Sequence, residues 1–436
     1  MSREMKYSGI EWIGYIPKYW TITKLKNIID FISGYAFKSE LFTISDNNKK
    51  VITIKSFNTK EIILDNLSYS NESLKFPTKY LLKNNDILFA MSGGTTGKNL
   101  LIEQVDDLYY INQRVGIIRS SFSKFIYYYI NTGLFSEYIN LFSSGSAQPN
   151  ISATDIQNFI IALPEKETIK KIEIYINYQL KIISNIIDTT YQSIEELKKY
   201  KQSLITEAVT KGIDPNVEMK ESGNDWIGSI PSNWSVRKIK HDFNLKGRIG
   251  WQGLTSNEYQ TVGPYLITGT DFKKGIIRWD SCVRISEERF EEAPDIHIKE
   301  NDLLITKDGT IGKVALATNV PKKVSLNSGV LLIREKSKNT INKKFMYYNL
   351  LSNMFWNWYN SNNQGASTIK HLYQGQFYNY SYAIPLLHEQ QQIVQYLDDK
   401  VSTIDRLIED KTKVIKELEN YKKSLIYEYV TGKKEV

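Results

Sequence analysis

The most regular hydrophobic pattern in the chain is a seven-residue repeat that occurs twice. Between Pro164 and Gly212, and again between Pro385 and Gly432, apolar side chains recur at alternating spacings of three and four residues. A seam of this kind over about four heptads predicts a long helix packed on another helix. Proline before a helix and glycine after it are typical helix boundaries. The apolar seam positions are Ile176, Leu180, Ile183, Ile187, Ile194, Leu197 and Leu204, then Leu397, Val401, Ile404, Ile408, Ile415, Leu418 and Leu425.

Two seams of equal length and register most simply pack on each other. Two amphipathic helices packed separately on their own domains would show the same pattern and remain the alternative. Lys201 and Lys422 occupy the same seam register, and two lysines buried side by side would be costly. An antiparallel pair separates them to opposite ends, where their ammonium groups reach water. We therefore expect an antiparallel coiled coil of roughly 60 Å at about 1.5 Å per residue.

Each predicted helix closes one copy of a longer repeat. The segment "GIEWIGYIPKYWTITKLK" recurs as "GNDWIGSIPSNWSVRKIK", and "NNDILFAMSGGTTGK" recurs as "ENDLLITKDGTIGK". Likewise "INQRVGIIR" recurs as "LNSGVLLIR", and residues 172–210 align without a gap to residues 393–431. Repeats of this length indicate duplicated structural units. The predicted domains are a first body (1–163), a central helix (164–212), a second body (213–384) and a C-terminal helix (385–436).

Both bodies mix strand-like and helix-like patterns. Short, β-branched apolar runs such as "DILFAM", "VGIIRS", "DLLITK" and "GVLLIRE" favour strands. The aromatic runs "SKFIYYYINTGLFSEYINLF" and "KKFMYYNLLSNMFWNWYN" favour helices, and most of their rings are expected in the core. We expect an α+β fold with two mixed α/β bodies joined by two long antiparallel helices, related by an internal pseudo-two-fold repeat.

Composition narrows the class of protein. The chain has 436 residues, a formal net charge of +8 and one cysteine, Cys282, so an intrachain disulfide and a cysteine-based zinc site are excluded. We expect no metal site, because the four histidines are far apart in sequence. With no secretory signal and no apolar run of about 20 residues, we expect a cytoplasmic protein. The two helical segments are together neutral, so the excess positive charge lies in the rest of the chain and favours a polyanion as partner.

The stretch "MSGGTTGKN" resembles a phosphate-binding loop but breaks its rule. The pattern G-x-x-x-x-G-K-[ST] requires glycine where Ser92 stands and a hydroxyl where Asn99 stands. The second copy fails likewise, with Lys307 and Val314 at those places. Strand-like residues follow each lysine, whereas a phosphate loop needs a helix. We therefore predict a glycine turn between two strands, whose Thr95, Thr96 and Lys98 either touch a ligand or only shape the turn.

Polar turns and loops are the candidate contacts with DNA. The loops "SSGSAQPNIS" and "NSNNQGASTIK" follow the aromatic helices at equivalent places. Asn and Gln can pair with adenine, and Ser and Thr with phosphates or bases, although an ordinary solvated loop has the same composition. The candidates are Ser92, Thr95, Thr96, Lys98, Gln113, Arg114, Gln148, Asn150, Lys307, Asp308, Thr310, Lys313, Asn327, Ser328, Gln364 and Ser367. No catalytic residue is predicted, because the motifs of methyltransferases, dinucleotide-binding enzymes and nucleases are missing.

The whole chain resembles a specificity (S) subunit of a type I restriction-modification system. The resemblance rests on "SGIEWIGYIPKYW" and its copy, on the two glycine-turn segments, on "SGSAQPNISATDIQNFIIALP" and on "IPLLHEQQQIVQYLDDKVSTIDRLI". The first helix departs from this pattern at its start, where "LPEKETIKKIEIYI" lacks Glu-Gln-Gln. That departure puts one partner contact in doubt but leaves the seam intact.

The resemblance implies a non-catalytic subunit that reads a split, asymmetric DNA target. Each body would be a target-recognition domain, and the helices would fix the distance between half-sites. Two modification (methyltransferase) subunits and restriction (translocase-nuclease) subunits would be its protein partners. S-adenosylmethionine, ATP and magnesium would be bound by those partners and no cofactor by this chain. The alternatives are a coiled-coil scaffold with incidental DNA contact, and an active methyltransferase or ATPase, which the missing motifs argue against.

Overall fold

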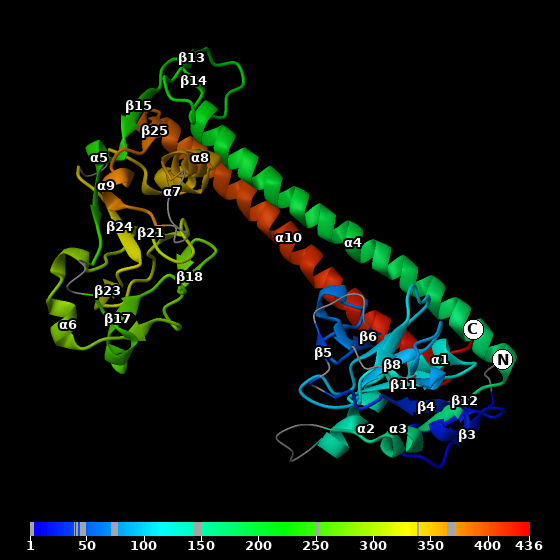
Figure 1. Ribbon diagram of the computed structural model, residues 1–436. Helices are drawn as coiled ribbons and strands as arrows, with labels where there is room; N and C mark the ends of the chain where they lie inside the picture. Colours follow the sequence, from blue (N-terminus) through cyan, green and yellow to red (C-terminus); the bar gives the residue numbers. More distant parts are fainter. Residues whose placement is uncertain are drawn as a thin grey trace. The chain divides into compact units, whose positions relative to one another are not determined.

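The two heptad stretches are continuous α-helices in a computed structural model of the chain. Helix α4 spans Lys166–Lys211 and helix α10 spans Leu387–Val430. The chain divides into two compact units, which are described separately: unit 1 combines Met1–Thr190 with Lys413–Val436, and unit 2 is Tyr191–Thr412. Each unit therefore contains an α+β body and one part of both helices (Figure 1). The structure describes residues 4–38, 40, 42–43, 49–70, 77–143, 150–248, 253–337, 340–363 and 371–436.

Within each unit the two helix segments run antiparallel. In unit 1 the Lys422 Nζ atom donates to Ser184 Oγ at 3.1 Å. In unit 2 the Lys201 Nζ atom pairs with Asp405 Oδ1 at 2.6 Å. Both seam lysines thus reach polar partners instead of each other, and the alternative of helices packed separately is wrong. The buried seam residues are Ile176, Ile183, Ile187, Ile194, Leu204, Leu397, Ile404, Ile415 and Leu425.

The body of unit 1 is built from small sheets. The central one has the order β4-β11-β8-β9, and the others are β10-β6-β7-β5, β12-β3 and the hairpin β1-β2. Strands β8 and β9 form an antiparallel hairpin, and β11 pairs antiparallel with β8. The strand bounds are β1 Met5–Tyr7, β2 Tyr15–Pro17, β3 Thr21–Lys24, β4 Asp30–Ser33, β5 Phe42–Thr43, β6 Lys49–Ile52, β7 Ser68–Ser70, β8 Ile87–Ala90, β9 Asn99–Leu101, β10 Tyr109–Ile111, β11 Val115–Arg119 and β12 Ile160–Leu163.

The body of unit 2 repeats this plan with a longer central sheet. Its sheets are β16-β24-β21-β22-β19-β18, β20-β17-β23, β15-β25 and the hairpin β13-β14. Strands β21 and β22 take the places of β8 and β9, so the predicted duplication is confirmed in three dimensions. The bounds are β13 Met219–Glu221, β14 Ser229–Pro231, β15 Ser235–Lys238, β16 Phe243–Lys246, β17 Gln260–Ile267, β18 Phe272–Lys273, β19 Ile276–Ile277, β20 Val283–Arg284, β21 Leu303–Thr306, β22 Val314–Leu316, β23 Val324–Leu326, β24 Val330–Glu335 and β25 Ser381–Ile384.

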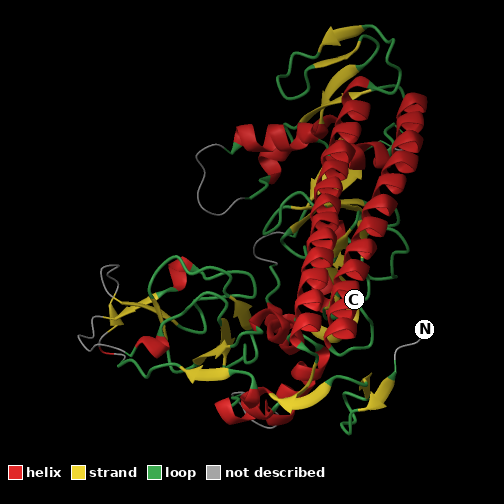
Figure 2. Ribbon diagram, turned by 90° about the vertical axis from the view of Figure 1, so that its right-hand side faces the viewer, coloured by secondary structure: helices red, strands yellow, loops and turns green. Residues whose placement is uncertain are grey.

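Each aromatic run forms two helices where the pattern predicts one. Figure 2 distinguishes the helices of the structure from its strands by colour. The first run divides at Thr132, whose hydroxyl donates to the carbonyl of Tyr129 at 2.7 Å. The second divides at Ser352, whose hydroxyl donates to the carbonyl of Asn349 at 2.6 Å. Such local side-chain bonds compete with helix continuation. The α-helices of the two bodies are α1 Ser123–Ile130, α2 Gly133–Ser143, α3 Ala153–Asn158, α5 Ile239–Asp242, α6 Glu287–Glu291, α7 Lys343–Leu351, α8 Asn353–Asn362 and α9 Gln374–Phe377.

The duplicated tryptophans attach the body of each unit to a helix end. Trp20 and Trp234 are buried, and the Trp234 indole nitrogen donates to Glu389 of α10 at 2.9 Å. In unit 1, Gly432 follows α10 with φ of +71°. A Cβ atom at Gly432 would lie 2.5 Å from Pro17, so only glycine fits there. The repeated segment around each tryptophan is therefore a structural joint.

Candidate nucleic-acid interface

The stretch "MSGGTTGKN" is a strand–turn–strand element. It joins β8 to β9, and Gly93 and Gly97 adopt φ of +84° and +89°. The Thr96 hydroxyl donates to the Gly93 carbonyl at 2.8 Å, which closes the turn. The corresponding turn in unit 2 joins β21 to β22 in the same way. A phosphate loop requires a helix N-terminus after the glycines, so the predicted glycine turn is confirmed.

The lysine of each turn points back into its own body. The Lys98 ammonium donates to the carbonyl oxygens of Ile54 and Phe57, at 2.7 Å for Phe57, and lies 4.5 Å from the Phe57 ring centroid. Burial lowers the Lys98 pKa below its ordinary value. Lys313 donates to the carbonyl of Gly269 at 3.0 Å. Both ammonium groups therefore secure a neighbouring loop, and their contact with DNA stays a prediction.

Three of the candidate segments in unit 1 meet at one edge of the body. Ser92 forms an antiparallel β-bridge with Asn150. The Met91 amide next to Ser92 donates to the Arg114 carbonyl at 3.0 Å. Asn150, Gln113 and Arg114 are exposed there. The glycine turn, the turn before β11 and the end of the polar loop thus form one surface, which we call edge 1, defined by Ser92, Thr95, Gln113, Arg114 and Asn150.

The equivalent segments of unit 2 meet in the same way. The Lys307 amide donates to the Gly329 carbonyl at 2.9 Å, and the Leu372 amide donates to the Lys307 carbonyl at 3.0 Å. The Asn327 side chain donates to the hydroxyl of Tyr259 at 3.0 Å, which fixes its amide orientation. We call this surface edge 2. It is defined by Lys307, Asp308, Thr310, Asn327, Ser328 and His371.

The two edges differ in charge chemistry. The guanidinium of Arg114 on edge 1 and the ammonium of Lys307 on edge 2 have no recorded side-chain partner within the described part of the chain. On edge 2 the Asp308 carboxylate also contacts the Nδ1 atom of His371. Arginine and lysine contact guanine or phosphate, whereas Asp can accept from cytosine. The same backbone frame therefore presents different side chains in each unit.

The sequence patterns did not predict that His371 lies at edge 2 beside Asp308. His371 is not among the predicted DNA contacts, and the signal that could have identified it is its place directly after the polar loop. Its ring also lies 4.5 Å from that of the exposed Tyr373. Three predicted contacts, Gln148, Gln364 and Ser367, lie outside the described residues.

Other repeated residues hold the fold. Asp86 is buried at the start of β8, at the end of that strand opposite to edge 1, and its two carboxylate oxygens accept from Arg119 at 2.7 and 2.6 Å. This hydrogen bond raises the Arg119 pKa above its ordinary value. In unit 2, Asp302 and Arg334 form the corresponding pair. The aspartate of "NNDILF" and the last arginine of "INQRVGIIR" therefore recur in both copies because they form one ion pair in each unit.

The described residues offer little for catalysis. Across those ranges no group of three or more His, Cys, Asp or Glu side chains could hold a metal ion. The single cysteine is buried, and burial raises its thiol pKa to about 12, so it is a poor nucleophile. No helix in the described ranges is long and apolar enough to cross a membrane.

A duplicated α+β chain that gathers polar turns at one edge of each unit, with Arg114 on edge 1 and Lys307 on edge 2, has the arrangement expected of a class of DNA-recognition proteins. A family model described as "Type I restriction modification DNA specificity domain" matches residues 17–204 and 231–419. The chain belongs to this family and is the DNA specificity subunit of a type I restriction-modification system. Such subunits are non-catalytic and carry no S-adenosylmethionine or ATP site of their own. The chain is part of a type I restriction-modification complex, and its partners are therefore DNA, modification subunits and restriction subunits.

Similar proteins span nearly the whole chain. The MjaVIII specificity subunit of Methanocaldococcus jannaschii is 23% identical, covering 96% of this chain and 93% of that protein. The EcoBI specificity subunit of Escherichia coli is 21% identical, covering 99% and 90%. A chain solved in a study of assembly of the type I R-M system has a TM-score of 0.72 at 14% identity, covering 95% and 98%. The HsdS subunit from Thermoanaerobacter tengcongensis has a TM-score of 0.53 at 14% identity, covering 96% and 98%. These structures share the fold.

Proposed function

We propose that the chain reads an asymmetric, bipartite DNA target, with edge 1 contacting one half-site and edge 2 the other. The observation that carries this proposal is the meeting of three polar segments at one edge in each unit. The side chains at matching places differ, since Arg114 corresponds to Gly329 and Ser92 to Lys307. Different readers on the same frame should select different base pairs, so the full target should not be a palindrome.

Phosphate contacts should supply the non-specific part of the affinity. The excess positive charge of the chain lies outside the neutral long helices, which fits bodies that hold DNA and helices that do not. Such binding weakens steeply as salt concentration rises, because neutralised phosphates release counterions. Flipping of the target adenine into a partner's pocket would also distort the DNA.

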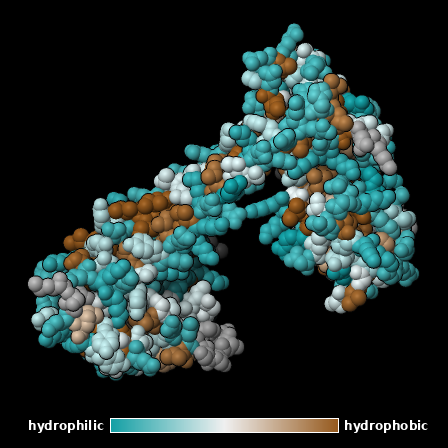
Figure 3. Space-filling model, turned by 180° about the vertical axis from the view of Figure 1, so that it is seen from behind, coloured by the Kyte–Doolittle hydropathy of each residue, from teal (hydrophilic) through white to brown (hydrophobic). Residues whose placement is uncertain are grey.

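The proposed partners are two modification subunits that bind S-adenosylmethionine, and restriction subunits that bind ATP and magnesium, all acting in the cytoplasm. An exposed apolar stripe on the unit 1 part of α4 supports protein docking: Ile174, Tyr178, Ile182 and Ile186 recur every four residues and are all exposed. Figure 3 shows hydrophobic atoms gathered along this helix. Native mass measurement of the assembled complex tests the proposed number of modification subunits.

Reciprocal variants test the reading of half-sites. We expect Arg114→Ala to relax base preference in one half-site and Lys307→Ala to weaken contacts in the other, each costing about 1–3 kcal/mol if the lost contact is to a base. Binding of the assembled complex to DNA with single base changes in each half measures this. The charge-preserving variant Arg114→Lys is the control for edge 1. If both alanine variants affected the same half-site, or neither affected DNA binding, the division of labour would be wrong.

A further inference from the structure

The internal repeat offers a comparison within the molecule at the ends of the long helices. In unit 1 the ring of Tyr429 on α10 lies 4.6 Å from the ring of Tyr175 on α4, measured between centroids. Tyr429 is 9% exposed, so its ring is enclosed. Aromatic pairs at this separation are stabilised beyond the burial of their area. The ring of Tyr429 therefore fills the space beside Tyr175.

Unit 2 has matching helix residues at this place but lacks that ring. In the gap-free alignment of the helices, Tyr396 corresponds to Tyr175, and Ala208 corresponds to Tyr429. The neighbouring residues match: Leu204 stands for Leu425 and Glu207 for Glu428. Only the methyl group of Ala208 is present where unit 1 has a phenol ring.

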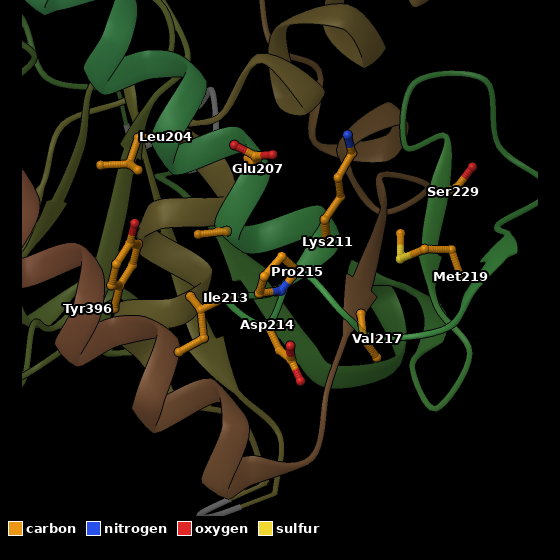
Figure 4. Close-up of a pocket in the computed structure, with 12 residues that line it drawn as sticks. Leu204, Glu207, Lys211, Ile213, Asp214, Pro215, Val217, Met219, Ser229 and Tyr396 are labelled. Carbon is orange, nitrogen blue, oxygen red and sulfur yellow. The ribbon is translucent and has the colours of Figure 1, made fainter.

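A cavity of about 610 Å³ occupies this place in unit 2. Ala208, Leu204 and Tyr396 line it, together with Ile213 and Pro215 of the segment that follows α4 (Figure 4). Glu207 adds a carboxylate to the lining. An apolar wall, an aromatic face and a few polar groups are the usual features of a binding site.

We infer that this cavity receives an aromatic side chain, tyrosine-like in shape, from a partner polypeptide in the assembled complex. The occupant's chemistry follows from unit 1, where a tyrosine on a polypeptide fills the matching space against the matching ring. Its source is a partner because the position in this chain that would supply it is Ala208. The two helix ends are then unequal: unit 1 is filled by its own Tyr429, and unit 2 is completed by another protein.

Binding of a probe to the intact chain tests the inference. The probe is N-acetyl-L-tyrosinamide, which carries the ring on a peptide backbone, and its saturable binding is measured by calorimetry or ligand-observed NMR. We expect wild type to bind it and Ala208→Tyr to bind it at least about tenfold more weakly, because the new ring occupies the cavity. Ser203→Tyr, which adds the same ring at an exposed position of α4, should bind like wild type.

Two further variants test the same inference in case Ala208→Tyr does not fold. Tyr396→Ala removes the aromatic wall at a half-buried position and should also weaken binding at least about tenfold. Tyr429→Ala opens the equivalent space in unit 1 and should add a second equivalent of bound probe. Both are compared with wild type at a temperature where circular dichroism shows a native spectrum.

Different probe-binding results would support or overturn the inference. Absence of probe binding to wild type would overturn the inference, as would equal binding by wild type, Ala208→Tyr and Tyr396→Ala. If p-cresol, the bare side-chain analogue, bound but N-acetyl-L-tyrosinamide did not, a polypeptide source would be excluded. Weaker probe binding by Ala208→Tyr and Tyr396→Ala, with wild-type binding by Ser203→Tyr, would support the inference.

Discussion

At the scale of single residues, the charged side chains in and around the glycine turns divide into a repeated group and a group that occurs in one copy only. Asp86, Arg119 and Lys98 point into the body of unit 1 and bind its own atoms. Arg114 is exposed and Lys307 is half-exposed, and among the described residues neither pairs with another side chain. Repetition of a charged residue in the sequence therefore does not by itself indicate DNA contact. Its partners decide which role it has.

The buried ion pair yields the first prediction. Asp86→Ala would leave the Arg119 guanidinium, 23% exposed, without its carboxylate. Breaking such a pair from one side costs about 3 kcal/mol or more, because a buried charge is left uncompensated. We expect the free energy of unfolding to fall by about that amount in urea titrations. Asp65→Ala, at an exposed position, should change it by less than about 0.5 kcal/mol, and equal effects would contradict the assignment.

Lys98 yields a prediction that separates the structural role from DNA contact. Lys98→Met keeps the alkyl chain but leaves the carbonyls of Ile54 and Phe57 without their donor, at a cost of about 1–3 kcal/mol in stability. Lys55→Met removes an exposed charge nearby and should leave stability unchanged. If Lys98 only holds the loop, the salt dependence of DNA binding by the folded variant should match wild type. A salt slope reduced by about one unit would instead show that Lys98 contacts a phosphate.

At the scale of elements, the body helices and long helices share buried tyrosines in each unit. Burial raises the pKa of Tyr128 on α1 to about 12, and Glu173 on α4 adds to the shift. Burial likewise raises the pKa of Tyr347 on α7 to about 12, aided by Asp405 on α10. Each phenol is held neutral by its packing against the helices. These tyrosines therefore report on whether body and helix are in contact.

The sign of the pH dependence follows from these shifts. A pKa that is higher in the folded state than in the unfolded chain gives stability that is fully present below about pH 10 and is lost between about pH 10 and 12. We expect the urea midpoint to fall across that window, while ultraviolet absorbance shows these phenols ionising after the exposed tyrosines. Tyr347→Phe should reduce the fall, and Tyr19→Phe, at an exposed position, should not. The same loss in all three proteins would contradict the account.

The length of the helices leads to a further prediction. Removing one heptad from both α4 and α10 keeps the seam in register and shortens each helix by about 10 Å at 1.5 Å per residue. If the helices set the separation of the two readers, the spacer between half-sites should shrink while both half-sites stay the same. Sequencing of methylated DNA from cells with the shortened subunit measures it. An unchanged spacer would show that the helices do not act as a ruler.

The sequence was sufficient for features that repeat locally. Heptad spacing predicted α4 and α10, and short β-branched runs predicted strands such as β8 and β21. It could not show that Lys98 reaches the carbonyl of Phe57 or that Ser92 bridges to Asn150, because these contacts join segments far apart in the chain. The breaks at Thr132 and Ser352 depend on hydroxyl groups that a hydrophobic pattern ignores. The sequence therefore predicted several separate turns, and it is the fold of each unit that brings these turns together at one edge.

At the scale of the whole molecule, duplication and divergence explain the function. The repeat preserves what holds each unit together: the tryptophan joint, the Asp–Arg pair and the helix seam. The places that differ are the edge residues and the helix ends, where Ala208 in the first copy corresponds to Tyr429 in the second. If the proposed function holds, two similar frames carry two different DNA readers, and the side chains on each frame set its base preference.

The central claim is that one chain reads two different half-sites. Single-molecule sequencing of methylated genomic DNA, from cells with and without this chain alongside the same modification subunit, tests it most directly. We predict one new methylated motif of two dissimilar specific segments separated by a fixed unspecific spacer. In cells with Arg114→Ala, preference should relax in one segment only. A palindromic motif, or an unchanged methylation pattern when the chain is removed, would contradict the account.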